Sequence, residues 1–191
     1  MEQLATKEEI RIEVPTKKIK KALMVIAFKN FKDEEYFVPK EILEKGGVEV
    51  KTASTKLGTA FGVEGGEANV DFLISEKKLV DKFDAIIFVG GPGCLEDLDN
   101  ENSYLLAKEA VAKNKLLAAI CISPVILAKA GVLRDKKATV WTSPFDKSSI
   151  KILEENGAEF IDQKVVRDGK IITANGPVAA EEFGRKILEN L

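Results

Sequence analysis

The chain has two cysteines, Cys94 and Cys121, and no histidine. Without histidine, neither a Ser-His-Asp nor a Cys-His triad can form within the chain, and histidine-rich catalytic zinc sites are excluded as well. Proton transfer must therefore use Asp, Glu, Lys, Tyr, Cys, water or a group of the substrate. A cysteine nucleophile in this chain has to work with such groups and with backbone amides.

Cys121 lies where an apolar strand meets a helix. Leu116–Ile120 ("LLAAI") is typical of a buried strand, Pro124 is a favourable first helical residue and Ser123 a favourable N-cap. The turn between them resembles a nucleophile elbow, and the helix N-terminus beside the sulfur predicts a lowered thiol pKa. The alternative interpretation is a packed core thiol, because free cysteine is among the most buried residue types.

A glycine pair, Gly90 and Gly91, ends a second apolar strand in "FVGGPG" (Phe88–Gly93). Glycine lets the backbone approach a ligand closely, with N–H groups free to donate. These donors could hold a carbonyl oxygen that gains negative charge beside Cys121. The alternative is an ordinary tight turn. Cys94, just beyond it, is expected to pack incidentally, with a second redox thiol as the alternative interpretation.

The third candidate element is the acidic stretch "DEEYFVP" (Asp33–Pro39), which follows the first strand. Acidic residues at a helix start are usually solvated, but one of them could point toward Cys121. A protonated carboxyl group there would donate a hydrogen bond to a thiolate, and its own pKa would rise. The residue pattern leaves Glu34 and Glu35 as alternatives.

Strands and helices alternate along the chain, and the central strands are apolar throughout, which predicts an α/β fold with a mostly parallel sheet and helices on both faces. Right-handed crossovers then give a flavodoxin-like three-layer sandwich, with sites beyond the carboxyl ends of the strands. A hairpin is expected at 58–70, and Pro39 should start or kink its helix. The predicted strands are 21–28, 48–54, 83–91, 116–120, 137–141 and 164–175, and the predicted helices lie within 29–47 and at 102–115, 124–131 and 179–191.

Composition narrows the class of protein. With 191 residues, 45% hydrophobic and 31% charged, the chain predicts one domain at 18–191 preceded by an extension at 1–17 of unknown role. A net charge of −2 gives no basic surface for nucleic acid or membrane. An N-terminus without an apolar signal core leads us to expect a cytoplasmic protein. No cofactor and no metal are expected, since no GxGxxG, phosphate loop or metal-ligand spacing occurs.

With these motifs in order, the chain resembles the ThiJ/PfpI superfamily over nearly its whole length. The resemblance rests on "DEEYFVP", "KLGTAFGVEGGEANVDF", "DAIIFVGGPG", "AAICISPVILAKAGVL", "KATVW" and "DGKIITANGP". It implies that the acidic partner is Glu35, four positions before the proline, and that Cys121 is the elbow cysteine. It further implies an oxyanion pocket from the backbone N–H groups of Gly91 and Ile122, with Pro177 in a nearby loop. A homodimer or higher oligomer is implied as well.

One departure from the resemblance bears on function. Protease-like members carry histidine after the cysteine, where this chain has Ile122, and Glu96 is one position away from the place of their second-subunit glutamate. The resemblance therefore implies action on a small-molecule electrophile, such as a reactive aldehyde, in a glyoxalase- or deglycase-like role in stress protection. The alternatives are a redox-sensing or chaperone-like protein without turnover, a cysteine peptidase, disfavoured by the missing histidine, and a binding protein with an inert cysteine.

Overall fold

The structure, a computed structural model, describes residues 19–191. The predicted extension at 1–17 lies outside the described residues. Within them, no helix is both long and apolar enough to cross a membrane.

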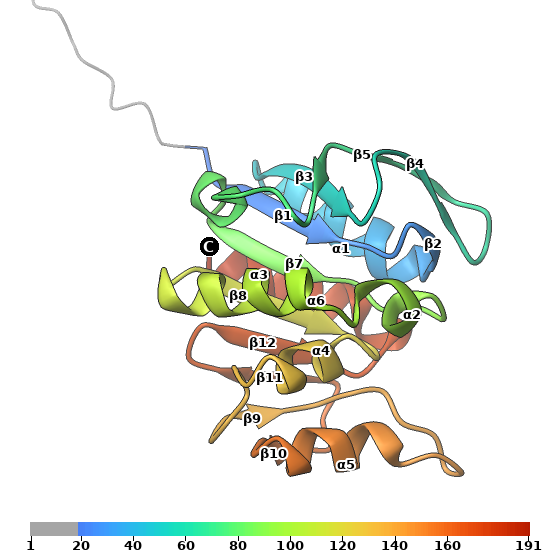
Figure 1. Ribbon diagram of the computed structural model, residues 1–191, viewed down its shortest axis with the longest axis vertical. Coiled ribbons are helices and arrows are strands. Elements are labelled where there is room, and N and C mark those ends of the chain that lie inside the picture. The colour runs from blue at the N-terminus through green and yellow to red at the C-terminus, as the bar shows by residue number, and fades with distance from the viewer. Residues whose placement is uncertain (1–18) are drawn as a thin grey trace, which may run out of the picture.

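A seven-stranded sheet forms the centre of the protein (Figure 1). Its strand order is β11-β12-β8-β7-β1-β3-β6, and every neighbouring pair is parallel except β11 and β12. The sheet is therefore mostly parallel, as the apolar runs predicted. Its strands are β1 (Lys21–Val25), β3 (Glu49–Ser54), β6 (Phe72–Leu73), β7 (Ala85–Phe88), β8 (Leu116–Ile120), β11 (Val165–Asp168) and β12 (Ile171–Ala174).

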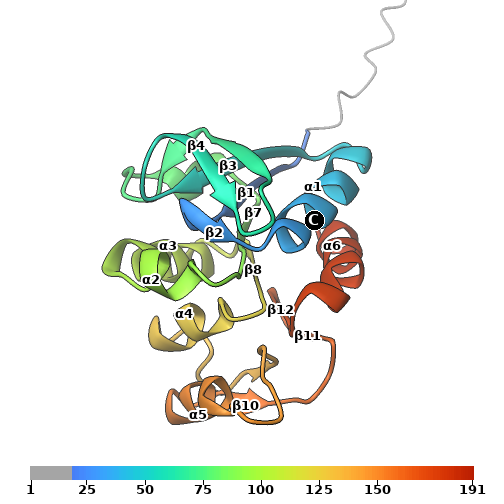
Figure 2. The same ribbon diagram turned by 90° about the vertical axis from the view of Figure 1, so that its right-hand side faces the viewer.

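Helices cover both faces of this sheet, which makes the fold a flavodoxin-like α/β sandwich. Figure 2 shows α1 and α6 on one side and α2, α3 and α4 on the other, and each side has its own buried apolar cluster. The six α-helices of the described residues are α1 (Asp33–Lys45), α2 (Cys94–Leu98), α3 (Glu101–Ala112), α4 (Pro124–Lys129), α5 (Ser148–Glu155) and α6 (Ala180–Glu189), with short 3-10 turns at Leu79–Lys82 and Pro177–Ala179.

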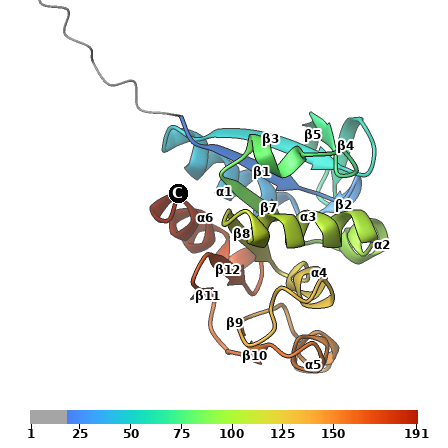
Figure 3. The ribbon, with the colours of Figure 1, turned by 60° about the vertical axis from the view of Figure 1, so that its left-hand side comes forward.

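Two smaller sheets flank the central one. The predicted hairpin consists of β4 (Gly58–Gly62) and β5 (Glu67–Val70), and β2 (Lys29–Phe31) pairs with β4. The predicted strand at 137–141 is much shorter, because only β9 (Lys137–Ala138) is extended, and it pairs with β10 (Glu159–Phe160) outside the main sheet. Figure 3 shows β9, β10 and α5 together beyond β11 and β12.

Helix α1 runs through Pro39 rather than starting at it. Proline has no N–H, so it cannot donate to the carbonyl group four residues earlier, which is that of Glu35. Pro39 instead packs against α6: a Cβ added to Gly184 would lie 2.9 Å from the Pro39 Cα atom. The close contact fixes α1 against α6 one turn beyond Glu35.

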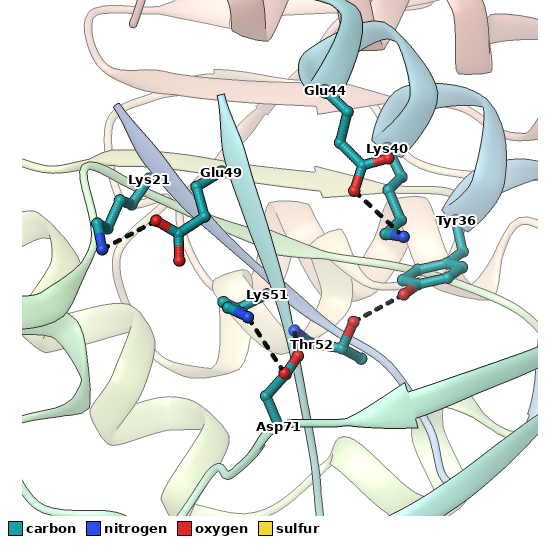
Figure 4. A network of polar contacts seen from close by, with 8 residues as sticks. All are labelled: Lys21, Tyr36, Lys40, Glu44, Glu49, Lys51, Thr52 and Asp71. Atoms are coloured by element: carbon teal, nitrogen blue, oxygen red, sulfur yellow. Dashed lines mark hydrogen bonds and ion pairs between the residues drawn. The ribbon is translucent and has the colours of Figure 1, made fainter. Parts of the chain in front are cut away.

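A buried polar contact ties the start of α1 to the sheet (Figure 4). The Tyr36 hydroxyl and the Thr52 Oγ1 on β3 are 2.7 Å apart, and the Thr52 N–H donates to Asp71 at 2.8 Å. Asp71 also pairs with Lys51 at 3.6 Å. Because Tyr36 directly follows Glu35, this network fixes the helical turn that carries the acidic side chain.

Candidate active site

Cys121 is the first residue after β8 and has a left-handed backbone conformation, with φ at 66°. Non-glycine residues seldom adopt this conformation, and when they do the surrounding structure must hold them there. Here both backbone groups are bonded: the Cys121 N–H donates to the Ala174 carbonyl and its carbonyl accepts from the Trp141 N–H, each at 2.8 Å. Strand β12 and the segment after β9 therefore hold the sharp turn that presents the thiol.

Ser123 does not cap helix α4 with its side chain, so the expected N-cap bond is absent. Its hydroxyl oxygen accepts from the Ile120 N–H at 3.0 Å and lies 2.9 Å from the Phe88 carbonyl, to which it donates. The serine thus links the ends of β7 and β8. Pro124 does occupy the first helical turn, as predicted.

The structure resolves the choice between the two neighbouring glutamates by burial. Glu34 is exposed on α1, whereas the Glu35 side chain is fully buried. Its Oε2 accepts from the Gly90 N–H at 3.1 Å, and its Oε1 has no hydrogen-bond partner in the part of the chain that the structure describes. Burying a carboxyl oxygen without a hydrogen-bond partner costs free energy of folding. This oxygen lies at the carboxyl ends of the strands, where sheets of this kind carry their functional sites.

Gly90 separates the glutamate from the cysteine. A Cβ added at Gly90 would lie 2.6 Å from Glu35 Oε2 and 2.5 Å from Cys121 Cβ. These two atoms are thus at most 5.1 Å apart, the sum of the two distances. Only a residue without a side chain fits between them, so the glycine pair serves the approach of two functional side chains as well as that of a ligand.

Burial dominates the electrostatics of this pair. It raises the pKa of the Glu35 carboxyl from 4.5 to about 7, against the opposing effects of the Cys121 thiol, the Gly90 N–H and the Lys32 charge. Burial also raises the pKa of the Cys121 thiol, and negative charge on Glu35 raises it further. The lowered thiol pKa predicted from the helix start is therefore wrong, because desolvation, together with the charge on Glu35, outweighs the effect of the nearby amides.

Gly91 and Ile122 bring two backbone donors to the sulfur. Their N–H groups act on the Cys121 thiol and lower its pKa, in opposition to burial. Gly91 has φ at 117°, and a Cβ there would lie 2.4 Å from the Lys32 backbone nitrogen. Glycine is thus required at this position both by conformation and by the packing of the β1–α1 connection.

These groups open into one pocket of about 370 Å³. Of the predicted site residues, Glu35, Gly91, Cys121, Ile122 and Pro177 line it, and Gly90 lies directly behind the pair. The lining residues that the sequence did not indicate are Lys32, Pro92, Leu95 and Trp141. Trp141 is the last residue of the predicted strand at 137–141, and no sequence pattern connects it to Cys121.

The hairpin tip is bound to the start of α1 beside this pocket. The buried carboxylate of Asp33 accepts from the Glu64 N–H at 2.8 Å and from the Gly66 N–H at 2.6 Å. Lys32, which lines the pocket, forms an ion pair with the Glu64 side chain, and this contact raises the pKa of Lys32. The ammonium group at the pocket edge is therefore already neutralised by a partner.

Two other residues considered from the sequence lie elsewhere. Cys94 is fully buried at the start of α2, and burial raises its thiol pKa, in keeping with an interior thiol. Glu96 lines a separate pocket on the other side of the Gly91–Gly93 loop. Among residues 19–191, no three His, Cys, Asp or Glu side chains gather as metal ligands would.

Comparison with known proteins gives consistent matches. The sequence model of the DJ-1/PfpI family matches residues 20–190. An uncharacterised protein of Methanocaldococcus jannaschii is 43% identical, over 88% of this chain and 81% of the relative. A protein of Pyrococcus abyssi named as a deglycase is 32% identical over 81% of this chain and 90% of its own length.

Two further matches are an animal protein and a crystal structure. A Caenorhabditis elegans protein named as a glutathione-independent glyoxalase is 30% identical over 90% of this chain and 89% of the relative. The crystal structure of a ThiJ/PfpI domain protein from Brachyspira murdochii superposes with a TM-score of 0.84 at 35% identity, over 91% of this chain and 96% of that one. Sequence and fold thus agree on the same group of proteins.

Proposed function

Because this chain belongs to the DJ-1/PfpI family, we propose that it acts on small reactive carbonyl compounds, in a glyoxalase- or deglycase-like role in stress protection. The observation that carries this proposal is the Glu35 carboxyl, buried with a pKa of about 7 and one oxygen without a partner, in the same pocket as Cys121. A group that titrates near neutral pH both gives and takes protons efficiently. Relatives named as a deglycase and a glyoxalase support the same reading.

The first step is addition of the Cys121 thiolate to the aldehyde carbon of a 2-oxoaldehyde. A carbon–sulfur bond forms and the carbonyl electron pair moves to oxygen, giving a hemithioacetal. The N–H groups of Gly91 and Ile122 hold the developing oxyanion. The Glu35 carboxylate takes the thiol proton as the carbon–sulfur bond forms and returns it to this oxyanion.

The second step uses the same carboxyl group as a base. The Glu35 carboxylate removes the proton from the former aldehyde carbon and returns it to the neighbouring carbon, while the hemithioacetal hydroxyl proton moves to the oxygen of that neighbouring carbon. This leaves a thioester of a 2-hydroxy acid on Cys121. Water hydrolyses this thioester and regenerates the thiol. The balance consumes one water for each 2-oxoaldehyde, releases one 2-hydroxy acid and requires no oxidant.

The test is turnover of methylglyoxal by the wild type, by Cys121→Ser and by Glu35→Gln. We expect 2-hydroxy acid production by the wild type and its loss in both variants. Cys94→Ser is the matched control, because it removes the other thiol without touching the pocket, and it should keep the wild-type rate. Equal rates in the wild type and Cys121→Ser, or no turnover in either, would contradict the proposal.

A second candidate function is redox sensing. It is favoured by the two backbone donors at the sulfur and by the unpartnered Glu35 oxygen, which suit the oxygens of a cysteine sulfinate. Two equivalents of hydrogen peroxide would oxidise the thiol first to sulfenate and then to sulfinate, releasing water at each step. Intact mass after mild peroxide, with the oxygen mapped to Cys121 rather than Cys94, is the expected result. Oxygen found on Cys94 alone would refute it.

Proteolysis is the least supported activity, because the chain has no histidine to serve as the base of a cysteine peptidase. The homo-oligomer implied by the resemblance stays a prediction. Light scattering coupled to size exclusion tests it directly: a mass near the 20.9 kDa of one chain would contradict it.

A further inference from the structure

The pocket at Cys121 is larger than a three-carbon dicarbonyl needs. Such a molecule has five non-hydrogen atoms and, at the roughly 30 Å³ that one water occupies in the liquid, takes at most about 150 Å³. The pocket has a volume of about 370 Å³, within the range of sites that bind larger organic ligands. More than half of the space therefore lies beyond the reacting carbonyl group.

The walls around this additional space are apolar. The polar groups collect at one end, at Cys121, Glu35 and the Gly91 backbone. The remaining lining side chains, apart from Lys32, are Pro92, Leu95, Ile122, Trp141 and Pro177. Lys32, at the edge of the pocket, forms an ion pair with the exposed Glu64 side chain.

Trp141 is the largest of these walls and is held in place from several sides. The Trp141 backbone N–H donates to the Cys121 carbonyl at 2.8 Å, and the Trp141 backbone carbonyl accepts from the Ser149 hydroxyl. A Cβ added at Gly176 would lie 3.4 Å from the indole ring. The side chain is nevertheless 38% exposed. A half-exposed indole on a backbone that is bonded to the nucleophile's own carbonyl offers a flat surface on which a ring can stack.

On these grounds, and resting on the proposed function, we propose that the preferred substrates are 2-oxoaldehydes with an apolar substituent of aromatic size. Trp141 and Ile122 are the specificity-determining residues. The substituent lies against the indole while the aldehyde carbon faces the thiol. Binding energy from this remote group is then available to position the carbonyl.

The experiment compares kcat/KM for phenylglyoxal and methylglyoxal, each corrected by the rate of Cys121→Ser to remove the reaction of phenylglyoxal with arginine. We expect the wild type to favour phenylglyoxal by about tenfold or more, as one well-matched apolar group allows. Trp141→Ala should lower this ratio by about tenfold through a higher KM for phenylglyoxal. Trp141→Phe, which keeps an aromatic ring, should restore most of it.

Phe145→Ala is the matched control. Phe145 lies on the same loop and is an aromatic side chain of full exposure that does not line the pocket, so the ratio should equal that of the wild type. A wild-type ratio at or below one, or an unchanged ratio in Trp141→Ala, would overturn the proposal.

Loss of the proposed function is distinguishable from loss of this inference. If the wild type turns over neither aldehyde, the proposed reaction is wrong. A binding measurement then tests separately whether the pocket accepts an aromatic group. Trp141 is the single tryptophan of the chain, so fluorescence of Cys121→Ser reports occupancy directly. Saturable change with acetophenone, and none with acetone over the same concentrations, supports the apolar pocket; absence of saturation with acetophenone refutes it.

Discussion

Glu35, which is buried, and Cys121, which is half-buried, are two acids that share one site, and each changes the ionisation of the other. Negative charge on Glu35 raises the pKa of Cys121, whereas the thiol lowers the pKa of Glu35, which burial has raised to about 7. Two groups coupled in this way lose their protons in two steps that belong to the pair. When only one proton remains, a protonated Glu35 can donate to a thiolate, while loss of both protons places two negative charges together.

This coupling predicts the pH dependence of thiol reactivity. Because burial and the charge on Glu35 both raise the pKa of the Cys121 thiol, its alkylation by iodoacetamide should stay slow at neutral pH and rise only at a more alkaline pH than that of a free cysteine. In Glu35→Gln the midpoint should move to lower pH, because the charge and the hydrogen bond of Glu35 that raise the thiol pKa are removed, while burial of the thiol remains. Peptide mass spectrometry at each pH separates Cys121 from the buried Cys94. A midpoint that rises in the variant would contradict this coupling between the two groups.

The raised pKa of Glu35 also predicts how stability depends on pH. Below the ordinary value of 4.5 the carboxyl is protonated in both folded and unfolded chains. Between 4.5 and about 7 only the unfolded chain releases its proton, so stability is lost as pH rises, up to about 3 kcal/mol. Glu35→Gln should therefore raise the free energy of unfolding above pH 7 by up to this amount and give no such gain at pH 4.

Urea denaturation at both pH values measures this effect. Glu34→Gln is the control, because its side chain is exposed on the same helical turn and its substitution should change stability by similar small amounts at both pH values. An equal gain for Glu35→Gln at low and high pH would show that its carboxyl group titrates normally.

The left-handed conformation of Cys121 predicts an unusual order of stabilities. A side chain in this conformation costs about 1–2 kcal/mol that glycine avoids. Cys121→Gly should therefore unfold with a free energy about 1 kcal/mol higher than Cys121→Ala. At Ala119, inside β8, the same comparison should reverse, because glycine in a strand is less stable than alanine. Denaturant titration of both pairs gives the answer, and a less stable Cys121→Gly would exclude backbone strain at the elbow.

Gly90→Ala should disturb the pair directly. The added methyl group would lie within 2.6 Å of both Cys121 Cβ and Glu35 Oε2, and 2.8 Å from the Ile120 carbonyl. We expect a loss of about 1–3 kcal/mol in stability, as for other overpacked interiors, together with a shifted pH midpoint of Cys121 alkylation. Gly65→Ala, where nothing lies within 4 Å of the new atom, should leave the midpoint unchanged. An unshifted midpoint in Gly90→Ala would show that the pair does not need this close approach.

The mostly parallel character of the sheet and the place of Cys121 at the end of a strand could be predicted from the sequence for a physical reason. Buried parallel strands must be apolar along their whole length, and a cysteine directly between such a strand and a Ser-Pro helix start has few alternatives. The prediction of a side-chain N-cap bond from Ser123 was wrong, because its hydroxyl bonds instead to the Phe88 carbonyl at the end of β7.

The rest of the site depends on contacts between distant segments. Gly90 had a predictable backbone role, but its position between Glu35 and Cys121 follows only from the packing of α1 against the sheet. Trp141 enters the pocket because its segment leaves the extended conformation after Ala138 and bonds to the Cys121 carbonyl. The residue pattern within one segment does not indicate contacts of this kind. Helix α5 is not predicted from the sequence for a related reason, since it follows a long irregular loop.

Gly90 offers a criterion for judging related chains whose chemistry has drifted during evolution. A cysteine and a glutamate can persist in a lineage for many reasons, including simple packing. The close pairing of their side chains, in contrast, requires that nothing larger than hydrogen project from the backbone between them. A homologue that has replaced this glycine has separated the two groups, whatever it retains at positions 35 and 121. The smallest residue of the site thus decides whether the two functional side chains can meet.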